Sequence, residues 1–167
     1  MKHRTVDASR TGTGGHPSEV SGVADSERVA ELRKLVGKYL DELGIKYFRD
    51  SDDDFLVPFE ESVRIHLVPK DFGDEMTVVQ VIAPTNLDVN VTNELAMFVA
   101  TENSKFVFGR LALYPEQKAV GFEESLLGTF LNRAELEVAI RVAATMANMY
   151  DDQIMQQFGG RKAGSGI

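Results

Sequence analysis

A run of three acidic residues is the first candidate for chemistry in this sequence. Asp52, Asp53 and Asp54 are consecutive, and a hard cation such as calcium prefers clustered carboxylate oxygens. An EF-hand, however, spaces its ligands at alternate positions and ends in a glutamate, whereas an apolar run begins directly after Asp54. We therefore interpret the acids as a solvated turn that blocks pairing at a sheet edge.

The triplet Asp71-Phe72-Gly73 matches the magnesium-binding triplet of protein kinases. A kinase also needs a glycine-rich strand loop, a strand lysine and a His-Arg-Asp catalytic loop. The sequence contains none of these parts. The triplet is therefore interpreted as a coincidence.

Three histidines, His3, His16 and His66, are candidates for a metal site or a general base. The first two lie in a segment without periodicity. His66 lies in an alternating run, in which it faces the opposite side from Ile65 and Leu67. A metal site needs further ligands that the sequence does not place nearby, so we expect His66 to be an exposed strand residue.

Hydrolysis by a nucleophile needs a hydroxyl or thiol, a base and an orienting acid. Ser62, Ser104 and Ser125 could supply the hydroxyl, but none lies in a nucleophile elbow. Glu123 and Glu124 are adjacent, so in a strand they point to opposite faces and cannot act together as acid and base. The sequence therefore predicts no enzyme, no cofactor, and no catalytic, cofactor-binding or metal-binding residue.

Composition limits the class of protein. The chain has 167 residues and is 43% hydrophobic, which is enough for one core. Its 26 acidic and 18 basic residues give a net charge of −8, which repels nucleic acid and anionic lipid. It has no cysteine, no apolar leader over residues 5–20 and no run of about 18 apolar residues that could span a bilayer. We expect a cytoplasmic protein without a nucleic-acid or membrane partner.

The hydrophobic period changes in a definite order along the chain. It is helical over 26–43, two-residue over 45–83, helical over 92–103, two-residue over 105–124 and helical over 132–158. This order predicts one α+β domain with an antiparallel sheet and helices, in the order α-β-β-β-(β)-α-β-β-α. The first strands are predicted to form a meander and the later two a second hairpin.

Capping and turn residues predict where several elements end. Asp25 or Ser26 can cap the first helix, and Gly44 can end it. Pro69 is expected to limit the strand that starts at Val63. Met76 to Ala83 is predicted to form the next strand, after the Asp71 to Asp74 turn. Thr92 and Asn132 can cap the other two helices.

Both ends of the chain are rich in small residues. Residues 1–24 have no hydrophobic period and are predicted to be a disordered tail, leaving 25–158 as the domain and 159–167 as a flexible C-terminal tail. The Gly-rich run at residues 11–15 is not flanked by a predicted strand and helix, and no Lys-Ser or Lys-Thr follows it. Both points argue against phosphate binding.

Large apolar residues exceed what one core face needs. They include Phe106, Phe108, Leu111, Leu113, Phe122, Met146, Met149 and Met155. Two interpretations stay open: core packing, or a surface for a partner chain or an extended peptide. Asp151 and Asp152 lie near the C-terminal end of the last helix, where the helix dipole disfavours negative charge. They indicate either an interaction there or a solvated helix end, and we favour the solvated end.

Four short segments resemble those of a known family. They are Tyr39-Leu40-Asp41-Glu42-Leu43-Gly44, Asp54-Phe55-Leu56-Val57-Pro58-Phe59, Glu102-Asn103 with Phe108-Gly109-Arg110, and Tyr150-Asp151-Asp152 before Phe158-Gly159-Gly160. With the element order, they make residues 25–160 similar to YbjN-like domains and type III secretion chaperones of the CesT kind. The resemblance implies a small non-enzymatic protein that binds peptide segments of other proteins and dimerises. It supplies no ligand residue, and nothing in the chain indicates a secretion apparatus.

The leading hypothesis is a chaperone-like domain that binds a polypeptide through a sheet face or edge, as a homodimer. The second hairpin and the last helix, with its small Ala143, Ala144 and Ala147, are the expected binding surfaces. The alternative is a small-molecule sensor with a closed pocket lined by Phe98, Phe106 and Met146. An enzyme would need a perturbed ionisable group, first sought at Glu124 or His66. An apolar, exposed sheet face opposite the helices would favour partner binding.

Overall fold

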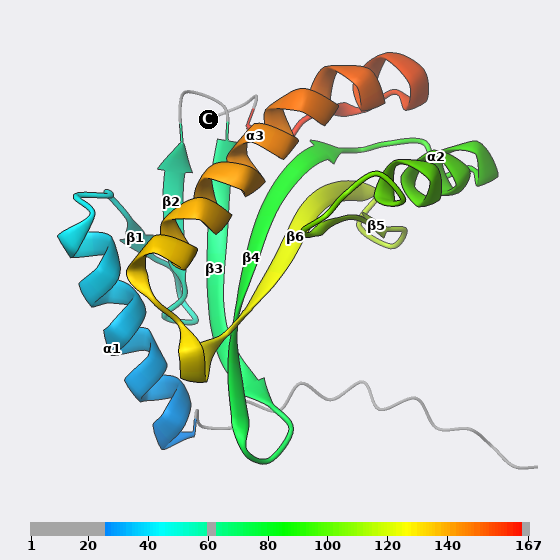
Figure 1. Cartoon of the computed structure of the whole chain (residues 1–167). Coiled ribbons are helices and arrows are strands. Elements are labelled where there is room, and N and C mark those ends of the chain that lie inside the picture. The colour runs from blue at the N-terminus through cyan, green and yellow to red at the C-terminus, as the bar shows by residue number, and fades with distance from the viewer. Residues whose placement is uncertain (1–25, 60–62, 165–167) are drawn as a thin grey trace, which may run out of the picture.

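The computed structural model describes residues 26–59 and 63–164 (Figure 1). The predicted N-terminal tail, with His3 and His16, lies outside the described residues. The elements in chain order are α1 (Glu27–Glu42), β1 (Phe48–Arg49), β2 (Phe55–Phe59), β3 (Val63–Phe72), β4 (Met76–Leu87), α2 (Asn93–Asn103), β5 (Arg110–Tyr114), β6 (Ala119–Leu127), the 3-10 turn η1 (Gly128–Phe130), α3 (Arg133–Phe158) and β7 (Arg161–Lys162). This order confirms the α+β class, with four strands in the first group.

The sheet is antiparallel, with the strand order β1-β2-β3-β4-β6-β5 and the short β7 beside β4. The pairs run from Phe59↔Val63 to Phe55↔Leu67 between β2 and β3. The meander β1 to β4 and the β5–β6 hairpin both form as the sequence predicts. In space, β6 lies between β4 and β5, so the second hairpin completes the sheet that the meander begins.

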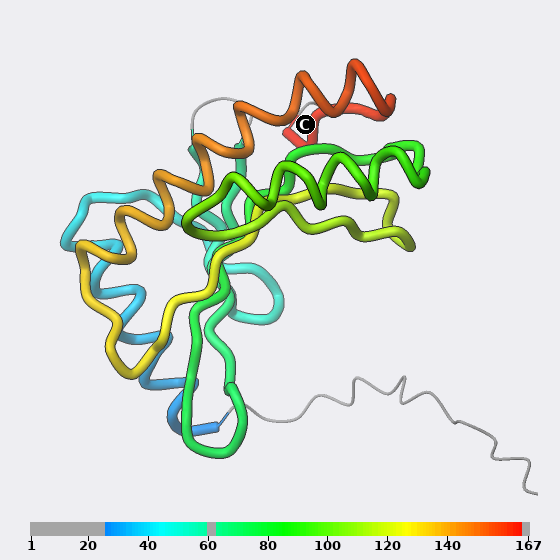
Figure 2. The backbone as a smooth tube through the Cα atoms, turned by 45° about the vertical axis from the view of Figure 1, so that its right-hand side comes forward, coloured from blue at the N-terminus to red at the C-terminus, as the bar shows by residue number. Residues whose placement is uncertain are grey.

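The helices lie on one side of the sheet. In Figure 1, α3 crosses in front of the strands, and α1 packs beside it; the turned view of Figure 2 shows α2 beside the last turns of α3. We call the helix-covered side the inner face and the opposite side the outer face. The core fills the inner face, and the predicted helical seam is buried there: Leu136, Ile140, Ala143, Ala147, Tyr150 and Ile154.

The helix caps follow the sequence. The Ser26 hydroxyl accepts a hydrogen bond from the Val29 amide at 3.2 Å. Thr92 and Asn132 accept the corresponding first-turn bonds of α2 and α3. Each bond satisfies an amide that has no partner within its helix. None of the described helices is both long enough and apolar enough to cross a membrane.

Pro69 does not limit its strand, contrary to prediction. β3 continues through it to Phe72, and Pro69 pairs with Val79 of β4. The pairing of β2 with β3 ends at Leu67, so beyond that point one side of β3 is a sheet edge. A missing amide is tolerated at an edge because no neighbouring strand needs it. The next strand is likewise longer than predicted, since β4 continues beyond Ala83 to Leu87.

Phe106 and Phe108 lie before β5 rather than within it. The strand starts only after Gly109, whose φ of +68° favours glycine. A Cβ at Gly109 would also clash with the Phe122 ring. The ring of Phe106 turns inward and packs on Phe122, with centroids 5.8 Å apart, while Phe108 stays exposed.

The segment after α3 differs from the predicted flexible tail where it is described. Arg161 and Lys162 form β7 and pair with Leu87 and Asn86 of β4. The Lys162 ammonium lies 3.1 Å from a carboxylate oxygen of Asp151 and 2.9 Å from one of Asp152. The two acids near the end of α3 therefore anchor β7, and the favoured interpretation of a solvated helix end is wrong.

Candidate functional site

The outer face of the sheet carries apolar side chains that no helix covers. Alternation places His66 and Val68 on this face, because their neighbours Ile65 and Leu67 are fully buried on the inner one. The register sets His66 opposite Ile82. Val68 and Ile82 are only half-buried.

These residues line a groove of about 420 Å³, which we call the outer-face groove. Its lining comes from β3, β4, β5, the β5–β6 turn and β6: His66, Val68, Ile82, Pro84, Leu87, Tyr114, Gln117, Ala119 and Val120. A smaller hollow of about 210 Å³ shares His66, Pro84 and Leu87 and extends to Arg64, Ala163 and Gly164. The segment around β7 therefore forms one end of the groove.

The β2 edge of the sheet is poorly suited to accept another strand. β1 pairs only with Phe55 and Leu56, which leaves the rest of β2 without a neighbour on that side among the described residues. Pro58 lies in this free part and has no amide to donate. Proline on an edge strand is a common way to discourage strand addition.

The β5 edge is closed by a side chain. The Asn103 carboxamide, at the end of α2, accepts a hydrogen bond from the Leu111 amide at 2.7 Å and donates one to the Leu111 carbonyl at 3.0 Å. It thus fills the place that a neighbouring strand would take. Glu102, the other residue of this motif, accepts bonds from the Tyr150 hydroxyl and the Lys105 ammonium. The segment is structural, and sequence reasoning missed its role at the edge.

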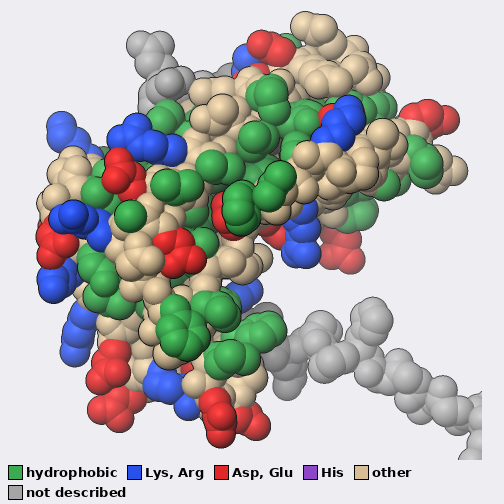
Figure 3. Space-filling model, viewed as in Figure 1, with side chains coloured by type: hydrophobic (Ala, Val, Ile, Leu, Met, Phe, Trp, Pro, Cys, Tyr) green, Lys and Arg blue, Asp and Glu red, His purple; other side chains and the backbone are tan. Residues whose placement is uncertain are grey.

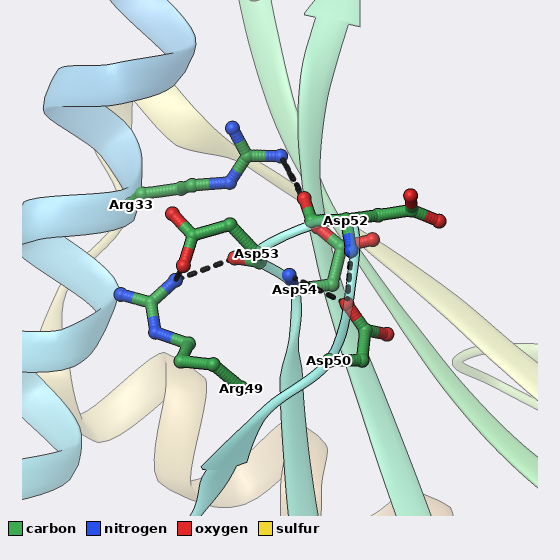
Figure 4. Close-up of polar contacts among 6 residues, drawn as sticks. All are labelled: Arg33, Arg49, Asp50, Asp52, Asp53 and Asp54. Atoms are coloured by element: carbon green, nitrogen blue, oxygen red, sulfur yellow. Dashed lines mark hydrogen bonds and ion pairs between the residues drawn. The ribbon is translucent and has the colours of Figure 1, made fainter.

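The acidic turn before β2 stabilises itself (Figure 4). The Asp50 carboxylate accepts hydrogen bonds from the amides of Asp52 and Asp54, each at 3.0 Å. Arg33 of α1 lies 3.3 Å from the Asp54 carboxylate, whose side chain is only 14% exposed. Burial raises the pKa of Asp54, and Arg33 opposes that shift. Asp54 is therefore not solvated as predicted, although the turn itself is confirmed.

His66 and Glu124 are the two ionisable groups that the sequence singles out. Burial lowers the pKa of His66 and raises that of Glu124, one of whose oxygens has no hydrogen-bond partner in the described structure. Glu124 pairs with the fully buried Val81 and so lies on the inner face, opposite to His66. The sheet separates these groups, and they cannot act as an acid–base pair. His66 is half-buried rather than exposed.

The adjacent glutamates do point to opposite faces, as predicted. Glu123 is 6% exposed on the outer side and accepts two hydrogen bonds from the Arg110 guanidinium, at 2.9 and 3.2 Å. Its other oxygen accepts a bond from the Tyr114 hydroxyl. Burial, and then this carboxylate, raise the pKa of Tyr114. The cluster fixes β5 to β6 and is fully engaged.

The serines do not complete a catalytic group. Ser62 lies outside the described residues, and Ser104 donates to the carbonyl of Thr101 at 2.7 Å. Ser125 is exposed on β6 opposite Gln80. Over residues 26–59 and 63–164, no three His, Asp or Glu side chains are grouped so that they could hold a metal ion.

The space proposed for a small molecule is occupied by aromatic rings. Phe98 packs against Phe158 with centroids 5.3 Å apart, and Phe106 lies 5.7 Å from Tyr150. These rings, with Met146, belong to the packing around the core. The alternative of a closed pocket between Phe98, Phe106 and Met146 is therefore not supported.

Other apolar side chains are exposed away from the groove. Met97 of α2 is 65% exposed, and Val107 and Phe108 after it are 86% and 68% exposed; we call these three the α2 patch. Hydrophobic side chains also gather at the lower end of the view in Figure 3, which shows the helix side. By contrast, Ala143, Ala144 and Ala147 are buried within the chain, so this part of α3 offers no surface to a partner.

Residues 30–165 match the family described as T3SS (YopN, CesT) and YbjN peptide-binding chaperone 1. No curated protein sequence matches the chain.

Solved structures with low sequence identity share the fold. The HopA1-SchA chaperone–effector complex matches with a TM-score of 0.59 at 10% identity, over 76% of this chain and 98% of the other. The Yersinia pestis type III secretion chaperone SycH, bound to a fragment of YscM2, matches with 0.53 at 14%, over 71% and 98%. YbjN from E. coli matches with 0.52 at 14%, over 75% and 93%.

Proposed function

The chain belongs to the family of T3SS and YbjN peptide-binding chaperones, and we propose that it holds an extended segment of another protein in the outer-face groove. Family membership and fold fit a non-enzymatic binding role. The similar HopA1-SchA structure is a chaperone–effector complex, and the similar SycH structure contains a fragment of YscM2. A bound polypeptide segment is therefore the ligand class that we carry over to this chain.

One observation supports the groove as the binding surface. The groove on the outer face is lined mainly by apolar side chains, several of them half-exposed, whereas Pro58 and the Asn103 carboxamide close parts of the two sheet edges. Strand addition at an edge needs free backbone groups, and these edges offer few. Apolar side chains left on an uncovered sheet face favour contact with a partner instead.

A substitution in the groove tests this proposal. The probe is a fluorescein-labelled peptide with a central Leu-Val-Leu-Val segment flanked by serines, and fluorescence anisotropy measures its Kd. We expect Ile82→Asp to weaken binding about tenfold or more, because a carboxylate would replace an apolar contact in the groove. Val138→Asp is the control, since Val138 is an exposed apolar residue on α3.

Thermal unfolding of both variants would show that each is folded. Equal Kd values for Ile82→Asp and the unmodified protein would contradict the groove as the site. No saturable binding of the serine-flanked peptide, or of the same peptide with charged flanks, would contradict the proposed function.

We also propose that the chain forms a homodimer through the α2 patch. Met97, Val107 and Phe108 have large exposed apolar areas, and such areas on a folded domain favour association. Light scattering should give twice the chain mass of 18.5 kDa. The Phe108→Glu variant should have the mass of a single chain. A mass near 18.5 kDa at high concentration would exclude the dimer.

The remaining proposals concern catalytic activity, cellular compartment and partners. We propose that the protein has no catalytic activity, because His66 and Glu124 lie on opposite faces of the sheet and the serines described have no adjacent base. The proposed compartment is the cytoplasm, which suits a chain without cysteine. Its net charge of −8 argues against nucleic acid and anionic membrane as partners.

A further inference from the structure

The rims of the outer-face groove carry cations. Arg64 borders the smaller hollow beside His66, and Lys118 lies between the lining residues Gln117 and Ala119. Both are exposed, and neither forms an ion pair with a residue that the structure describes. One charge therefore stands on the β3 side of the groove and the other at the β5–β6 turn.

Two carboxylates of the outer face and its end are already paired. Glu123 is held by Arg110 and Tyr114. Asp88, next to the end of β4, lies 2.9 Å from the guanidinium of Arg161. These two acids are held by other partners and form no ion pair with Arg64 or Lys118.

The acidic turn before β2 affects the pKa of His66, which lines the groove. Burial lowers the pKa of His66, Asp50 and Asp54 oppose that shift, and Arg64 adds a smaller lowering. Asp54 is paired with Arg33, and Asp50 accepts bonds from two amides of its own turn. Their carboxylates are thus engaged at the β2 side.

We propose that the outer-face groove takes a short apolar peptide segment flanked on both sides by aspartate or glutamate. This inference rests on the proposed function and specifies its ligand. The apolar residues would contact Val68 and Ile82, and the flanking carboxylates would reach Arg64 at one end and Lys118 at the other. At physiological salt, charges more than about 8 Å apart are largely screened, so a flanking carboxylate would interact mainly with the cation that it contacts.

Three matched peptides test the preference. Each has the same labelled Leu-Val-Leu-Val centre, flanked by glutamates, by serines or by lysines, and anisotropy gives each Kd at low and at physiological salt. We expect the glutamate-flanked peptide to bind about tenfold more tightly than the lysine-flanked one, because each exposed charge pair contributes a modest factor. The preference should shrink as salt rises.

Charge reversal on the rim provides the second measurement. Arg64→Glu, and independently Lys118→Glu, should each reduce the preference for glutamate flanks to about threefold or less. Lys34→Glu changes the net charge equally on an exposed site of α1 and should leave the preference unchanged. Both rim residues are exposed, so the reversed proteins are expected to fold.

The outcomes separate this inference from the proposed function. Equal binding of the glutamate-flanked and lysine-flanked peptides would overturn the acidic preference while the groove remains a peptide site. An unchanged preference for glutamate flanks in both rim variants would also overturn the proposed role of Arg64 and Lys118. If none of the three peptides binds, the proposed function fails and this inference fails with it.

Discussion

The two faces of the sheet are built by the same strands but differ in what covers them. On the inner face, Ile65, Leu67 and Val81 are fully buried beneath α1 and α3. On the outer face, Val68 and Ile82 remain half-exposed. An antiparallel sheet with one solvated face usually carries polar side chains there. Packing in the core therefore accounts for the apolar residues of the inner face. The apolar residues of the outer face stay in contact with water unless a partner covers them.

The largest expected effect comes from removing an inner side chain. Phe122 of β6 is fully buried and packs on the Phe106 ring. We expect Phe122→Ala to lower the free energy of unfolding by about 3–5 kcal/mol, because it removes buried contacts and leaves a cavity. Urea unfolding followed by circular dichroism measures this change.

The matched outer substitution sharpens the comparison. Val68→Ala should cost less than about 1 kcal/mol, since the side chain is only half-buried in the free protein. It should weaken peptide binding, which is measured by anisotropy. Similar losses of stability in the two variants would break the distinction between the faces.

An intermediate effect is expected at the β5 edge, which must be closed for the outer face to be the main binding surface. Asn103→Ala should lower the free energy of unfolding by about 1–3 kcal/mol, because it removes both partners of the Leu111 backbone. It should also increase association, measured by light scattering, since a bare edge accepts strands.

Asn93→Ala is the control for this experiment, because Asn93 is exposed at the start of the same helix. An edge that is closed by Asn103 predicts a clear difference between the two variants. Equal stability and equal mass would mean that the carboxamide does not protect the edge.

The smallest effect concerns Glu124, a carboxylate on the mainly apolar inner face. Burial raises its pKa above the ordinary 4.5, so the folded state binds the proton more tightly than the unfolded state. The contribution of Glu124 to stability therefore falls as pH rises from its unfolded-state pKa through its higher folded-state pKa, and it stays unfavourable at neutral pH. Glu124→Gln should stabilise the protein at pH 7 by less than about 1 kcal/mol.

Thermal melts across pH measure this stabilisation. The advantage of Glu124→Gln should disappear below about pH 4, where the carboxyl is protonated in both states. Glu116→Gln, in the exposed β5–β6 turn, should show no such trend. A stabilisation that stays constant down to low pH would mean that charge on Glu124 is not its cause.

Much of the inner architecture is predictable from the sequence. The spacing from Leu136 to Ile154 identifies the buried seam of α3, and the caps at Ser26, Thr92 and Asn132 mark where helices begin. These signals are local, because a side chain bonds an amide three residues ahead or repeats with the helical period. They were confirmed without knowledge of any long-range contact.

The candidate site depends on contacts that local patterns do not encode. His66 is recognisable as an outer residue from its alternation, but the groove forms only when the register places it beside Ile82 and the β5–β6 turn. Pro69 was expected to end its strand, yet the missing neighbour at that part of β3 lets the strand continue. A proline ends a strand only where an amide is needed.

The sequence by itself determined the order of elements, their caps and which side of each long strand faces the core. These follow from side-chain periods of two and about 3.6 residues, which are properties of neighbouring residues. Only the tertiary structure decided that Asn103 closes the β5 edge, that Lys162 is anchored by Asp151 and that the outer groove has cationic rims. Each of these joins residues from different elements, so packing and strand register bring them together.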